Sequence, residues 1–169
     1  SWLHYFYCAD LVGAKTVSYP LLEENGFNVI PEDIEKLVTP KTKMVIVNSP
    51  NNPTGSILSK ESLQAIADIA NKYDLIVLSD EIYEKLIYDD SVHYSIASLD
   101  GMKERTVLIH GVSKSYSMTG WRIGFAVSAN KEFISAMIRV LQYTVTCANS
   151  FAQDGACLLY TSPSPRDTR

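Results

Sequence analysis

Four short apolar runs with many β-branched residues stand out along the chain, at residues 44–48, 75–79, 106–110 and 123–127. Runs of this length and composition are typical of buried β-strands. Between the first two runs, residues 60–73 carry apolar side chains at a helical spacing, and Ser59 precedes them as a candidate N-cap. The order strand, helix, strand within about 35 residues predicts a βαβ unit with a right-handed crossover.

Two more helices are expected outside this unit. One should begin after Asn130, with an apolar face made of Phe133, Ile134, Met137, Ile138 and Leu141. The other should open at Pro31, because a proline followed by acidic residues suits a first helical turn. Strands that are apolar throughout, rather than alternating, predict a sheet covered on both faces. The expected fold is therefore α/β, a three-layer sandwich around a mostly parallel sheet.

Composition narrows the class of protein. Of the 169 residues, 46% are hydrophobic, and the net charge is −4, which favours a folded domain over a basic nucleic-acid-binding surface. No apolar run reaches the length of a membrane span. Cys8, Cys147 and Cys157 fit neither zinc spacing nor a disulfide framework, so a reducing, cytoplasmic setting and no metal site are expected. The first residues lack a signal-peptide pattern and a starting Met, as an internal segment would.

Two polar segments directly follow the first two predicted strands. The string NSPNNPTG, residues 48–55, cannot continue a strand, so a rigid turn is expected, with a candidate cis bond before Pro53. Asp80 ends the second strand, where a partly buried carboxylate needs a cationic partner, and Tyr83 can face the same way. The ordinary interpretations are a polar turn for the first segment and a helix N-cap for Asp80. In parallel sheets, however, ligands bind at the carboxyl ends of strands.

A third segment, residues 112–124, reads VSKSYSMTGWRIG and follows the third strand. Lys114 stands among three serines, and Arg122 follows eight residues later. Hydroxyls beside two cations are suited to hold a phosphate, and a lysine there can form an imine with a carbonyl cofactor. A solvated lysine in a polar loop is the ordinary alternative. Together, the three segments supply an amine, an acid, ring-oxygen donors and a phosphate anchor, which is the set that pyridoxal phosphate requires.

The strings NSPNNPTG, SDEIYE and SKSYSMTGWRIG resemble those of class I pyridoxal-phosphate-dependent aminotransferases of fold type I, above all the aspartate-aminotransferase-like subgroup. The resemblance covers residues 2–156 in order and spacing. It implies a partial cofactor-binding large domain at residues 1–156. Residues 157–169 are then expected to be an unrelated or artefactual tail, and the small C-terminal domain of the family is absent.

The resemblance implies a role for each matching residue. Lys114 would form the Schiff base with pyridoxal 5′-phosphate and act as the catalytic proton carrier. The other cofactor-binding positions are Asp80 at the pyridine nitrogen, Asn52 and Tyr83 at the ring oxygen, Arg122 at the phosphate and Trp2 stacked on the ring. Gly111 departs from the pattern, because many relatives have a phosphate-binding hydroxyl residue three positions before the lysine.

The function implied by the resemblance is transfer of an amino group between an amino acid and a 2-oxo acid, by a homodimer with no nucleic-acid or membrane partner. Two alternatives remain open at this point. One is a pyridoxal-phosphate-dependent C–S lyase or synthase on the same fold, which would share these cofactor residues. The other is a non-catalytic domain of a regulator, which would need a DNA-binding segment outside this sequence.

Overall fold

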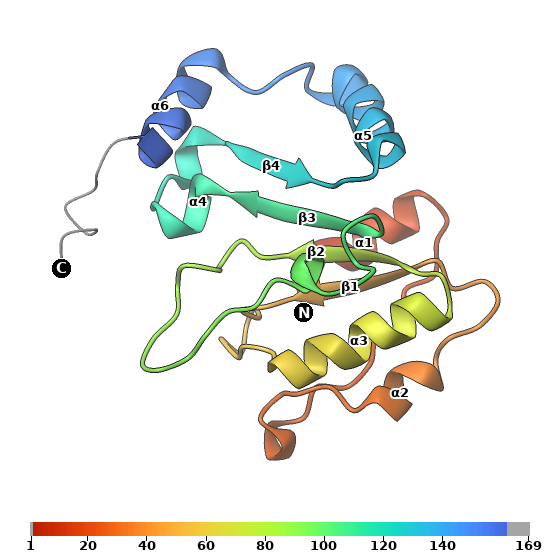
Figure 1. The fold of residues 1–169 in the computed structure, drawn as a ribbon. Helices are drawn as coiled ribbons and strands as arrows, with labels where there is room; N and C mark the ends of the chain where they lie inside the picture. Colours follow the sequence, from red (N-terminus) through yellow and green to blue (C-terminus); the bar gives the residue numbers. More distant parts are fainter. Residues whose placement is uncertain (1, 162–169) are drawn as a thin grey trace.

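The computed structural model of the chain describes residues 2–161. Its four strands form one sheet in the order β1-β2-β3-β4 (Figure 1). They are β1 Met44–Asn48, β2 Ile76–Asp80, β3 Thr106–Gly111 and β4 Gly124–Val127. The first three are parallel, and β4 runs antiparallel to β3. All four predicted strands are thereby confirmed, with bounds that differ by no more than one residue.

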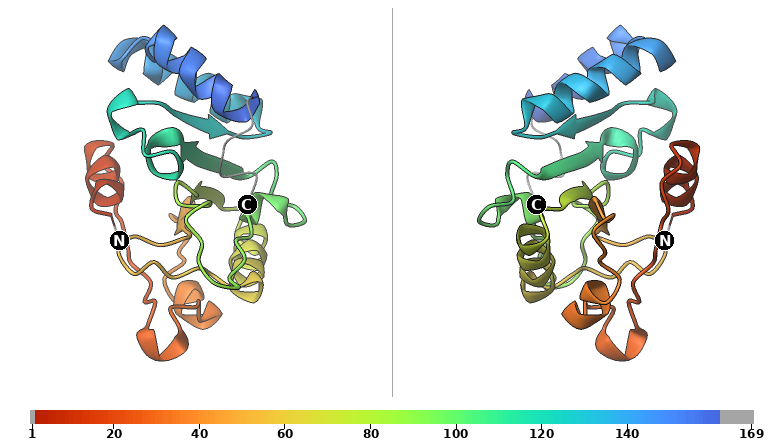
Figure 2. Two further views of the ribbon diagram at one scale, coloured as in Figure 1. Left: turned by 90° about the vertical axis from the view of Figure 1, so that its left-hand side faces the viewer. Right: turned by 90° about the vertical axis from the view of Figure 1, so that its right-hand side faces the viewer.

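The helices lie on both sides of this sheet. They are α1 His4–Leu11, α2 Pro31–Glu35, α3 Lys60–Lys72, α4 Val112–Ser115, α5 Lys131–Thr144 and α6 Ser150–Thr161, with short 3-10 turns at Glu23–Asn25, Ile96–Ser98 and Thr119–Trp121. Figures 1 and 2 show α1 and α3 on opposite faces of the sheet. The predicted α/β architecture with a mostly parallel sheet is therefore confirmed.

Helix α3 forms the main core with the sheet. The Ser59 hydroxyl accepts a hydrogen bond from the Ser62 backbone N–H at 3.1 Å, so the predicted N-cap is present. The four apolar residues predicted to form its stripe are all buried, namely Leu63, Ile66, Ala67 and Ala70. They pack in one cluster with Val47 of β1 and Val77 of β2. This packing holds the βαβ unit together, and the polar segments follow its two strands.

A second, smaller cluster lies at the far end of the sheet. Val112 and Ile123 pack there with Ala152 and Ala156 of α6. Helix α6 continues to Thr161, so the boundary expected after residue 156 falls inside a helix. The unrelated tail at 157–169 stays a prediction, and its residues 162–169 lie outside the part of the chain that the structure describes.

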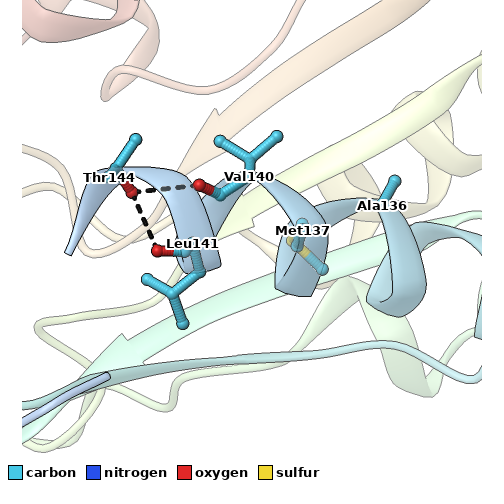
Figure 3. A pocket seen from close by; sticks show the side chains of 5 residues that line it. All are labelled: Ala136, Met137, Val140, Leu141 and Thr144. Carbon is cyan, nitrogen blue, oxygen red and sulfur yellow. Dashed lines mark hydrogen bonds between the residues drawn. The ribbon is translucent and has the colours of Figure 1, made fainter. Parts of the chain in front are cut away.

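Helix α5 shows where the sequence pattern was incomplete. Asn130 caps it as predicted, because its side chain accepts hydrogen bonds from the N–H groups of Glu132 and Phe133. Its expected apolar face is not covered, however: no residue of α5 is buried, and Leu141 is 44% exposed. An apolar hollow of about 350 Å³ lies along this helix (Figure 3). None of the helices in residues 2–161 is long and apolar enough to cross a membrane.

Candidate active site

The polar segments predicted from the sequence meet at one edge of the sheet. Because β1, β2 and β3 are parallel, their carboxyl ends lie side by side, and Asn48 is paired directly with Asp80. The Asn48 side-chain amide donates to the Asp80 backbone carbonyl at 3.1 Å, and this bond joins the two strand ends. The edge has the position at which open α/β sheets bind ligands.

The turn after β1 holds Asn52 against the end of β2. The peptide bonds before Pro50 and Pro53 are cis, which confirms the candidate cis bond before Pro53. The Asn48 side-chain oxygen accepts the Asn52 backbone N–H at 3.0 Å. The Asn52 side-chain amide in turn donates to the Tyr83 hydroxyl at 3.3 Å. The two residues expected at the cofactor ring oxygen are therefore in contact.

Asp80 is 7% exposed, and its two carboxylate oxygens have separate donors. Oδ1 accepts the Ile82 backbone N–H at 3.2 Å, but residues 82–85 form a turn rather than a helix, so Asp80 is not the helix N-cap of the ordinary interpretation. Oδ2 accepts the hydroxyl of Tyr5, a residue 75 positions away in the sequence. Within residues 2–161, Asp80 has no salt-bridge partner. A buried carboxylate without a cation is suited to a cationic ligand group.

Tyr5 is a site residue that the sequence analysis missed. Burial raises the pKa of the Tyr5 hydroxyl well above its ordinary value, and its hydrogen bond to Asp80 raises the pKa further. The Trp2 ring lies edge-on to the Tyr5 ring, with centroids 5.9 Å apart and an interplanar angle of 90°. Trp2 therefore lies beside the residue that binds Asp80. Trp2 precedes α1 and Tyr5 lies in its first turn, so the short spacing of three residues between these two aromatic side chains is a signal that could have revealed the pair.

Lys114 lies in α4, directly after β3. Its Nζ is 6.0 Å from the centroid of the Tyr83 ring, which brings Lys114, Tyr83 and Asn52 to one place. Lys114 is exposed and forms no salt bridge within residues 2–161. The neighbouring Ser115 hydroxyl is buried and has no hydrogen-bond partner within residues 2–161, which leaves one polar group beside Lys114 unsatisfied.

Arg122 lies just before the fourth strand. The apolar run that predicted this strand begins at residue 123, the strand itself begins at Gly124, and Arg122 precedes it in the left-handed region with φ of 55°. Its guanidinium donates to the Thr119 backbone carbonyl at 2.9 Å and is exposed. In the described part of the chain, no contact joins Arg122 to Lys114 or Asp80.

The glycine at position 111 has a steric explanation. It lies opposite Gly124 in the antiparallel pair of β3 and β4. A Cβ at Gly111 would lie 2.9 Å from the Ile123 carbonyl oxygen and 3.1 Å from the Gly124 Cα. A serine or threonine at this position would force the backbones apart. The hydroxyl that many relatives carry here therefore does not fit this chain, and any replacement donor must come from another position.

The residues that follow Asp80 form a network of acids and histidines. Glu81, Glu84 and His93 bring ligand-capable atoms within 4.8 Å of one another. His93 Nε2 is 2.9 Å from Glu81, and His110 Nε2 is 2.8 Å from Glu84. Each carboxylate thus already faces an imidazole nitrogen. The cysteine-based expectation of no metal site did not consider these residues, and it stays a prediction.

Comparisons with known proteins place this geometry in a family. Residues 1–156 match the model described as aminotransferase class I and II. An aspartate aminotransferase of Pyrococcus abyssi is 53% identical over 86% of this chain and 37% of its own length. Aromatic-amino-acid aminotransferase 2 of Thermococcus litoralis is 49% identical over the same shares.

Solved structures agree with these relatives. An aromatic aminotransferase from Pyrococcus horikoshii has a TM-score of 0.92 and 44% identity, over 99% of this chain and 44% of the other. The aspartate aminotransferase from Thermus thermophilus with maleate has a TM-score of 0.85 and 40% identity, over 90% and 39%. The chain therefore spans about two fifths of the length of these proteins. On the family match, the sequence identity and the fold, the chain belongs to the class I and II aminotransferase family.

Proposed function

We propose that the full-length protein moves an amino group between an amino acid and a 2-oxo acid with pyridoxal 5′-phosphate as cofactor. The observation that carries the proposal is the meeting of Asn52, Tyr83, Asp80 and Lys114 at the carboxyl ends of three parallel strands. The chain's similarity to aspartate and aromatic aminotransferases supports the same reaction.

The chemistry of the donor set fits this cofactor. Asp80 is a buried carboxylate without a cationic partner in residues 2–161, as the acid that pairs with a protonated pyridine nitrogen should be. Lys114 offers an amine that no carboxylate of residues 2–161 holds in a salt bridge. The unpartnered Ser115 hydroxyl and the exposed Arg122 guanidinium are donors suited to a phosphate. Trp2, beside Tyr5, is the aromatic side chain that would stack on the ring.

When bound, the cofactor supplies a carbonyl that condenses with amines and a ring that accepts an electron pair. Lys114 Nζ would hold the cofactor through its carbonyl group, and once the substrate's amino group has displaced it, the freed amine would take and return the proton of the substrate α-carbon. Asp80, whose carboxylate is oriented by Tyr5 and the Ile82 N–H, would keep a proton on the ring nitrogen. The Tyr83 hydroxyl, which accepts a hydrogen bond from Asn52, would donate to the ring oxygen.

Three finer statements belong to the same proposal. The substrates are an amino acid and a 2-oxo acid, as the names of the relatives suggest. The full-length protein is a homodimer, which sedimentation can test. It works in the cytoplasm, which agrees with Cys8, Cys147 and Cys157 being free and exposed in the described part of the chain.

Chemical trapping tests the cofactor assignment directly. The full-length protein is incubated with pyridoxal 5′-phosphate and reduced with borohydride, and the modified peptide is identified by mass spectrometry. We expect one stable adduct on Lys114 and none in Lys114→Ala. An adduct on another lysine would contradict the assignment. Transfer is then followed with and without an added 2-oxo acid, since a lyase would release ammonia and pyruvate without an acceptor.

A further inference from the structure

Two histidine–carboxylate contacts flank Tyr83 in the sequence. Glu81, two residues before it, contacts His93 Nε2 at 2.9 Å, and Glu84, the residue after it, lies 2.8 Å from His110 Nε2. Glu81 is 2% exposed, so the first contact is shielded from water, whereas in the second His110 is 4% exposed and the Glu84 side chain is 32% exposed. None of these four residues was assigned a role by the sequence patterns.

The contact between Glu81 and His93 joins the two ends of the chain segment at residues 82–92, which carries Tyr83. Besides His93, the Glu81 carboxylate accepts the hydroxyls of Ser79 at 2.9 Å and Ser95 at 2.8 Å. Ser79 belongs to β2, whereas His93 and Ser95 lie where the chain returns from the excursion at residues 82–92. Both ends of that excursion are therefore tied to the end of β2 by one buried carboxylate.

The second contact joins the same segment to the strand that leads to Lys114. Glu84 lies in the turn that begins at Glu81, whose carbonyl accepts the Glu84 N–H at 3.0 Å. His110 is on β3, four residues before Lys114. The contact therefore spans the two pieces of chain that present the Tyr83 hydroxyl and the Lys114 amine.

The tautomer of His110 suits this role. The Gly111 backbone N–H donates to His110 Nδ1 at 2.7 Å, so the proton of the neutral ring is on Nε2, the nitrogen that faces Glu84. Nε2 is buried and forms no well-aligned hydrogen bond with any residue that the structure describes, so its contact with the Glu84 carboxylate is electrostatic. The ring also stacks on Phe125 of β4, with centroids 5.2 Å apart, which fixes its orientation.

We propose that Glu84 and His110 are positioning residues that hold the Tyr83 hydroxyl at a fixed place relative to Lys114. The Tyr83 hydroxyl accepts a hydrogen bond from the Asn52 side-chain amide at 3.3 Å, and the centroid of its ring is 6.0 Å from Lys114 Nζ. A catalytic group must be held within about 0.5 Å of its working position by residues around it. The inference rests on the proposed function, because it assigns a purpose to the placement of Tyr83 beside Lys114.

The test is a pH titration of the visible absorbance of the bound cofactor in the full-length protein. Loss of the Tyr83 hydroxyl donor raises the apparent pKa of the bound chromophore, whereas loss of a nearby negative charge lowers it. If Glu84 acts by positioning Tyr83, Glu84→Gln shifts this pKa upward, as Tyr83→Phe does, by about half a unit. The double variant then shifts no further than Tyr83→Phe alone.

Two further variants separate positioning from charge. His110→Gln keeps the Glu84 carboxylate and should give the same upward shift, so it also serves if Glu84→Gln does not fold. Glu35→Gln is the matched control, because it breaks an ion pair of 2.8 Å with Lys72 at the surface formed by α2 and α3. It should leave the titration unchanged.

The outcomes distinguish this inference from the proposed function. An unshifted or downward-shifted titration in both Glu84→Gln and His110→Gln, with Lys114 still carrying the cofactor, overturns the positioning role alone. Additive shifts in the double variant also overturn it, because Glu84 would then act independently of Tyr83. A wild-type protein that forms no adduct at Lys114 overturns the proposed function first.

Discussion

The hydrogen bond from Tyr5 to Asp80 should make a measurable contribution to the free energy of unfolding. Tyr5→Phe removes the hydroxyl and keeps the ring, so the buried Asp80 carboxylate loses one of its two donors and keeps the Ile82 N–H. Hydrogen bonds to charged groups contribute about 1.5–3 kcal/mol. Because Tyr5 is only partly buried, water can replace part of the lost bond. We therefore expect Tyr5→Phe to lower the free energy of unfolding by about 1.5 kcal/mol, the lower end of this range.

Urea denaturation of the chain at neutral pH measures this loss. Tyr7→Phe is the matched control, because Tyr7 lies on the same helix and is 60% exposed. Its change should stay within about 0.5 kcal/mol, as is usual for surface substitutions. If Tyr5→Phe and Tyr7→Phe unfold at the same urea concentration, Tyr5 does not support Asp80, and the anchoring of α1 to the sheet through this bond is refuted.

Two further predictions concern steric fit and alkaline stability. Gly111→Ser should lower the free energy of unfolding by about 1–3 kcal/mol, because the added side chain overpacks against Ile123. Gly120→Ser is the control and should have little effect, because a Cβ there meets no described atom within 4 Å. Equal denaturation midpoints for the two variants would contradict the close approach of the strands. Burial raises the pKa of Tyr19 from 10.0 to about 12. The unfolded chain therefore loses this proton first as pH rises, and the free energy of unfolding should fall between pH 10 and 12 by up to about 2.7 kcal/mol. Denaturation curves recorded at several pH values measure this decline, and Tyr19→Phe should make it smaller. If the free energy of unfolding falls as steeply with pH in Tyr19→Phe as in the wild type, Tyr19 is not its source.

The fold was predictable where local pattern and tertiary packing agree. The apolar stripe of α3 and its Ser59 cap follow from residues within one helix, and both are present. The strands β1 and β2 follow for the same reason, since their apolar runs are buried against α3. The apolar residues of α5 show the limit of this argument: the pattern predicts a helix correctly but does not say what covers it.

The candidate site was predictable where it depends on strand ends. Asn52 and Tyr83 follow neighbouring parallel strands, so topology alone brings them to one edge, and their contact at 3.3 Å agrees. Tyr5 was not predictable from topology, because α1 precedes the first strand and reaches Asp80 across 75 positions. The left-handed conformation of Arg122 ahead of β4 was not predictable either, because it leaves no mark in the apolar pattern.

The comparison of relatives also indicates which chemistry this part of the fold contains. An aspartate aminotransferase and an aromatic-amino-acid aminotransferase resemble the chain almost equally, at 53% and 49% identity over the same share. Proteins that differ in their named substrates therefore share this segment to a similar degree. The contacts found here join strand ends, the acid, the phenol and the amine to one another. Similarity over this segment therefore does not distinguish the two kinds of relative by the substrates in their names.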